Sequence, residues 1–111
     1  MIVKDLINAL GCDMLSGTED TLSREVTGGY CGDLLSWVMG RAGEGEAWVT
    51  IMPNVNVAAV ASLTDVSCVI LAEGVKPDAV LLERAIREEL PLLASKLSAF
   101  ELCVKIGDSL K

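Results

Sequence analysis

Apolar positions recur with a helical period at the start of the chain and then in short runs separated by glycine and proline. From Ile2 to Leu10, apolar residues stand three and four apart, which predicts an amphipathic helix ending at Gly11. Residues 12–15 predict a short strand, and the polar run 16–20 predicts a surface loop. Residues 1–22 are therefore expected to form a helix followed by a short strand and a loop.

From residue 23 to about residue 106, short apolar runs alternate with helical patterns. Strands are predicted over residues 25–27, 47–52, 66–72 and 92–94, and helices in the segments between and after them. The run Val66–Ala72 is almost continuously apolar, which is typical of a central strand covered on both faces. This alternation predicts one α/β domain over residues 1–111, with a mainly parallel sheet of about four to five strands and helices packed on it.

Polar residues mark where the later helices begin. Asn54 or Asn56 can cap the third helix, and only one of the two can do so. Asp78 is suited to capping the next helix, and either Ser95 or Ser98 starts the last one. That helix is expected to run to Ile106, with a tail that frays.

The segment that draws most attention is Thr27-Gly28-Gly29, placed between a strand pattern and a helix that opens near Asp33. Two adjacent glycines predict a sharp turn with positive φ that leaves backbone N–H groups open to an anion. Two other interpretations stay open. The turn can serve geometry alone, or the Asp33 carboxylate can cap those amides itself.

Loops at the carboxyl ends of parallel strands meet at one sheet edge and form a ligand crevice. Four predicted loops are small, polar and contain glycine or asparagine. The candidate ligand-binding residues in them are Thr27, Gly28, Gly29, Tyr30, Asn54, Asn56, Glu73, Gly74, Ser95 and Ser98.

Composition narrows the classes of function. The chain of 111 residues is 51% hydrophobic and only 4% aromatic, so its core must be aliphatic. A net charge of -7 argues against nucleic acid or an anionic membrane as partner, because both are bound through clustered basic residues. The chain contains no histidine, which excludes Ser/His/Asp and Cys/His catalytic units within one chain. We expect no catalytic residue.

Four cysteines at positions 12, 31, 68 and 103 include no Cys-x-x-Cys pair, so no metal site and no cofactor is expected. They are typical of small apolar residues in a reducing cytosol. Cys31 is the exception, because a nearby helix N-terminus would lower its thiol pKa. The N-terminus lacks a signal-peptide pattern and no apolar run reaches membrane-spanning length, which favours a cytoplasmic protein.

Several of these segments together resemble the DRTGG domain, a small α/β module of certain phosphate acetyltransferases and CBS-domain pyrophosphatases that also occurs as stand-alone proteins. The matching segments, which cover most of the chain, are 25–29, 49–51, 56–63, 69–71, Gly74, 77–78 and 97–101. No single motif is specific, but their order and spacing are.

The sequence also departs from the family pattern. The motif's Asp and Arg are Glu25 and Val26 here, so no anion-binding role of that arginine carries over. The family is similar to the N-terminal domain of HPr kinase, but the phosphate loop Gly-x-x-x-x-Gly-Lys-Ser/Thr is absent, and the Gly40–Gly45 loop contains no lysine.

The resemblance implies a non-catalytic regulatory domain, commonly dimeric, that senses a nucleotide or another small anionic metabolite and signals to a partner protein. A second hypothesis is a docking or dimerisation domain with no small ligand, using the apolar helix Leu34–Met39 as its face. In that helix Trp37 is expected in the core or a dimer interface. The third is a small enzyme dependent on Cys31 or Tyr30, which the absence of histidine disfavours.

Overall fold

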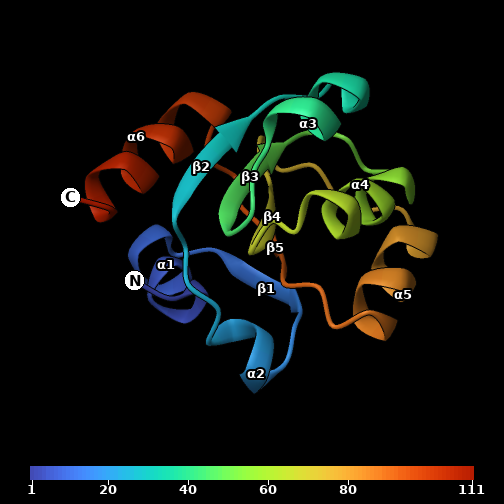
Figure 1. Cartoon of the computed structure of the whole chain (residues 1–111), viewed down its shortest axis with the longest axis horizontal. Coiled ribbons are helices and arrows are strands. Elements are labelled where there is room, and N and C mark those ends of the chain that lie inside the picture. The colour runs from blue at the N-terminus through green and yellow to red at the C-terminus, as the bar shows by residue number, and fades with distance from the viewer.

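A computed structural model describes residues 1–111 and places them in one sheet with helices on both faces (Figure 1). The strands are β1 (Asp13–Ser16), β2 (Gly28–Cys31), β3 (Glu46–Thr50), β4 (Cys68–Leu71) and β5 (Leu92–Ala94). The helices are α1 (Val3–Leu10), α2 (Glu19–Leu22), α3 (Leu35–Arg41), α4 (Asn56–Thr64), α5 (Ala79–Arg87) and α6 (Ala99–Ser109).

The sheet has the order β1-β5-β4-β3-β2. Strands β2, β3, β4 and β5 run parallel, and β1 pairs antiparallel with β5 at one edge. The predicted α/β class and mainly parallel sheet are confirmed. The expectation that residues 66–72 hold the central strand is also confirmed, since all four residues of β4 are buried.

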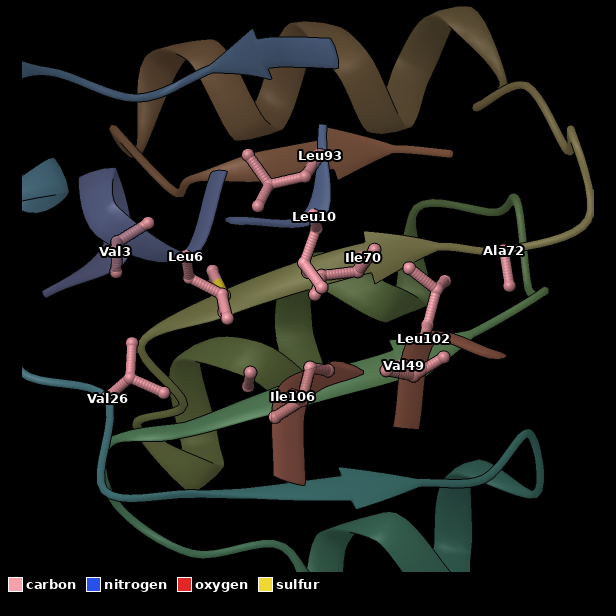
Figure 2. Packing of buried hydrophobic residues seen from close by; sticks show 12 residues of the cluster. Val3, Leu6, Leu10, Val26, Val49, Ile70, Ala72, Leu93, Leu102 and Ile106 are labelled. Carbon is pink, nitrogen blue, oxygen red and sulfur yellow. The ribbon is translucent and has the colours of Figure 1, made fainter. Parts of the chain in front are cut away.

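Helices divide between the two faces of the sheet, as Figure 1 shows: α1 and α6 cover one face, and α3, α4 and α5 cover the other. Each face has its own cluster of 12 buried residues. Figure 2 shows the first, where Leu6 of α1 and Leu102 and Ile106 of α6 pack over Val49 and Ile70 of the sheet. Successive residues of a strand point to opposite faces of the sheet, so one strand contributes side chains to both clusters. The sheet therefore connects the two layers.

Several predicted boundaries differ from the structure. The polar run 16–20 is not wholly a loop, because Thr18 caps the short helix α2 and accepts a hydrogen bond from the Thr21 N–H. Residues 25–27 precede a strand instead of forming one. The last helix continues beyond Ile106 to Ser109. No helix in the structure is both long enough and apolar enough to cross a membrane.

Candidate functional site

The glycine pair predicted to form a turn lies within strand β2. Neither Gly28 nor Gly29 has positive φ, and both pair in register with β3, Gly28 with Glu46 and Gly29 with Ala47. The predicted strand-to-helix turn is therefore wrong. The true connection to α3 begins after Cys31, and the amides of the glycine pair are not presented by a turn.

The glycine pair allows close packing instead. A Cβ at Gly29 would stand 3.4 Å from Cγ2 of Ile106, so α6 packs directly on this strand. Tyr30 points to the opposite face, where it packs half-buried against the second core cluster. Gly29 is itself exposed, and its missing side chain leaves room for Ile106 of α6.

Thr27 lies at the amino end of β2, away from the carboxyl ends of the parallel strands. Its Oγ1 donates a hydrogen bond to the Glu44 carbonyl oxygen at 2.9 Å, which ties it to the loop before β3. Residues 27–30 therefore do not join the other candidates at the carboxyl edge as predicted. Of the four predicted loops, three do meet at that edge.

Asp33, which follows β2, connects two of the strand ends. Its Oδ1 accepts hydrogen bonds from the Thr50 hydroxyl at 2.8 Å and from the Ile51 N–H at 2.9 Å. The alternative that Asp33 caps the amides of the glycine pair is wrong. Its carboxylate holds the β2–α3 loop against the end of β3, a role that the sequence did not show because its partners lie 17 and 18 residues away.

Neither asparagine is the N-cap residue of α4, which is Val55 and has no side-chain capping bond. The Asn54 Oδ1 accepts a hydrogen bond from the Asn56 N–H at 3.0 Å in the turn before the helix, and Asn56 is the exposed first residue of α4. Asn56 makes no side-chain hydrogen bond within the chain. Asp78 precedes α5 as predicted, but its side chain makes no capping bond.

The loops after β4 and β5 are joined by hydrogen bonds. Gly74 N–H donates to the Ser95 carbonyl oxygen and Glu73 N–H to the Leu97 carbonyl oxygen, both at 2.9 Å. The Glu73 carboxylate also accepts from the Ala99 N–H at 3.2 Å. Glu73, Gly74, Ser95 and Ser98 are thus brought together, as the sequence predicted.

Ser98 is the cap of α6. Its Oγ accepts from the Glu101 N–H at 3.1 Å, and the Glu101 carboxylate accepts from the Ser98 N–H at 3.3 Å. Ser95 instead closes a turn, because its Oγ accepts from the Leu97 N–H at 3.1 Å. The hydroxyl oxygens of both serines are therefore engaged within the loop.

A groove of about 400 Å³ opens beside these two loops. Its lining includes two predicted candidates, Gly74 and Ser95, together with Lys76 and Lys96, which were not predicted. Half-buried Leu15 and Leu82 form an apolar part of the wall. The signal for these two lysines in the sequence is their charge, whereas the predicted loops were marked by glycine and asparagine.

The cysteines do not form an activated site. Cys31 belongs to β2 and is not at a helix N-terminus, and burial together with the neighbouring Cys103 raises its pKa to about 11. Burial also raises the pKa of Cys12 to about 11 and that of Cys68 to about 12. The predicted lowering of the Cys31 pKa is wrong. No group of three metal-ligating side chains gathers elsewhere.

Comparison with known proteins gives a likeness of fold. The structure is similar to that of the CBS and DRTGG domains of the regulatory region of Clostridium perfringens pyrophosphatase, which was solved in complex with its activator, diadenosine tetraphosphate. The TM-score is 0.71 at 14% sequence identity, over 98% of this chain and 47% of that one. This chain thus spans about half of that neighbour. No protein-family model matches the sequence. No curated protein matches it either.

Proposed function

We propose that this chain is a non-catalytic regulatory domain of the DRTGG type that senses a small anionic metabolite or nucleotide. The observation that carries the proposal is the groove at the carboxyl edge of the sheet, lined by Lys76 and Lys96 in a chain of net charge -7. Such edges are where open α/β sheets bind ligands. The likeness to a regulatory region agrees with this role.

The way the two groove loops connect to the helices supports this role. Its two loops connect β4 to α5 and β5 to α6, and the hydrogen bond between Gly74 and Ser95 ties them together. A ligand held by both loops would stabilise helices on opposite faces of the sheet at once. A partner protein, or a second copy in a homodimer, would then sense the altered stability of these helices.

A thermal-melt screen tests the proposal. Purified protein is melted with AMP, ADP, ATP, diadenosine polyphosphates, NADH, acetyl phosphate or common carboxylates, while its mass in solution is measured in parallel. A ligand at 100 times its Kd adds ~2.7 kcal/mol, a shift of several degrees for a domain of this size. If no ligand raises the melting temperature of well-folded protein, the result would count against ligand sensing.

A docking function is the second candidate, because α3 and the residue before it expose apolar side chains. Leu34 is 59% exposed, Trp37 57% and Met39 46%. Trp37 is thus outside the core of the chain, contrary to one of the two expectations, and its ring lies 3.8 Å from the Arg41 guanidinium. This alternative predicts a dimer that dissociates in the Trp37→Asp variant. It also predicts that no small ligand changes the melting temperature of the protein.

A further inference from the structure

Most basic side chains of this acidic chain form no ion pair, and Lys76 and Lys96 are two of them. The chain has 9 basic and 16 acidic residues. Three basic side chains form ion pairs, namely Arg24 with Asp65, Arg84 with Glu88 and Lys111 with Asp108. Lys76 and Lys96 form none, although they line the same groove. Two unpaired ammonium groups at one groove are an anion-binding arrangement.

Backbone geometry brings these two lysines together from separate loops. The hydrogen bond from the Gly74 N–H to the Ser95 carbonyl oxygen fixes one loop against the other at 2.9 Å. Lys96 directly follows Ser95, and Lys76 stands two residues after Gly74. The backbone N–H groups of Lys76 and Lys96 find no acceptor within the chain. The lining of the groove therefore includes two basic side chains held on adjoining loops.

The remaining walls limit what else the ligand carries. Leu15 and Leu82 present apolar surface, and Asp13 contributes the single carboxylate of the lining. A volume of about 400 Å³ is near the lower end of the roughly 300–1,000 Å³ of small-molecule sites. The ligand is thus compact, with an apolar part for the leucines and a hydrogen-bond donor for Asp13.

We propose that this groove binds a phosphomonoester of about mononucleotide size, a proposal that rests on the ligand-sensing function above. A phosphomonoester carries about 1.5 to 2 negative charges at neutral pH, which the two ammonium groups match. Its ring lies against Leu15 and Leu82, and a sugar hydroxyl donates to the Asp13 carboxylate. A polyphosphate is disfavoured, because its extra charges would face Asp13 without a cation.

Calorimetric titration of the full chain with AMP, adenosine, ATP and diadenosine tetraphosphate tests this assignment. AMP should bind saturably and more tightly than the other three. Lys76→Met and Lys96→Met should each weaken AMP binding about tenfold or more, since charge-assisted hydrogen bonds are lost. Asp13→Asn keeps an acceptor and removes the opposing charge, so it should raise ATP affinity relative to AMP.

Lys105→Met is the matched control, because Lys105 is also exposed and unpaired but lies on α6 away from the groove. It should leave AMP affinity unchanged, and all variants should melt like the parent without ligand. An AMP affinity that is unchanged in both Lys76→Met and Lys96→Met would overturn the groove assignment. Binding only of a non-phosphate ligand would overturn the ligand class and leave the sensing function standing. Binding of none of the screened ligands would remove both.

Discussion

Gly45 has a backbone conformation that side chains resist. Its φ is +80°, and a Cβ there would stand 2.8 Å from Oγ1 and 2.9 Å from Cγ2 of Thr27. Moving Thr27 would break its hydrogen bond to the Glu44 carbonyl oxygen. Gly45→Ala therefore combines backbone strain with a steric clash.

We expect Gly45→Ala to lower the free energy of unfolding by about 2–3 kcal/mol. Urea denaturation followed by circular dichroism measures the change. Gly29→Ala is the control, because Gly29 has no positive φ and its new Cβ would meet Ile106 at ordinary contact distance. The control should fall within about 1 kcal/mol of the parent. Equal losses in both variants would contradict this account of the two glycines.

The Cys31 thiol should react slowly although it is exposed. Although the residue is exposed overall, partial burial is the chief cause that raises its pKa from 9.0 to about 11, and Cys103 is the next, so below pH 9 its thiolate fraction is about a hundredfold lower than that of a free thiol. The rate of alkylation by iodoacetamide, measured by mass spectrometry of the peptide containing Cys31, should rise about tenfold per pH unit until the pH approaches 11. Cys103→Ser should increase the rate at pH 8 only in part, since burial is the larger cause. A rate that is flat above pH 7 would show an activated thiolate.

Helix α6 depends on the capping box formed by Ser98 and Glu101. Ser98→Ala removes the acceptor of the Glu101 N–H and should cost about 1 kcal/mol in the free energy of unfolding, measured by urea denaturation. Ser62→Ala is a suitable control, because Ser62 is exposed within α4 and alanine favours a helix. That control should be neutral or slightly stabilising. A Ser98→Ala protein as stable as the parent would mean that water replaces the cap.

Elements with strong local patterns were predictable from the sequence. Helix α1 has apolar residues on one face and a glycine stop, and β4 is a continuous apolar run, so each was placed correctly. Strand β2 was misplaced, because two glycines favour a turn when only local propensity is considered. Pairing with β3 and packing under Ile106 determine its conformation, and neither contact is local in sequence.

The candidate site was predictable only in part for the same reason. The rule for parallel sheets correctly placed Glu73, Gly74, Ser95 and Ser98 at one edge. It also placed Thr27 there, because the strand was assigned a few residues too early. Lys76 and Lys96 were missed, since their proximity follows from a hydrogen bond between loops about 20 residues apart in the sequence.

The two tryptophans report on how the whole molecule unfolds. Trp48 is fully buried on the face covered by α3, α4 and α5, and its Nε1 donates to the Gly32 carbonyl oxygen at 2.9 Å. Trp37 is 57% exposed. In a Trp37→Phe protein, fluorescence therefore monitors one face of the sheet alone, whereas far-ultraviolet circular dichroism monitors helices on both faces.

We expect the two signals of the Trp37→Phe protein to change at the same urea concentration. Strands β3, β4 and β5 contribute side chains to both core clusters, so neither layer can lose its packing while the other keeps an intact sheet. Removing the contact between Trp37 and Arg41 should cost no more than about 1 kcal/mol. A circular dichroism transition that precedes the fluorescence change would show that α1 and α6 separate first.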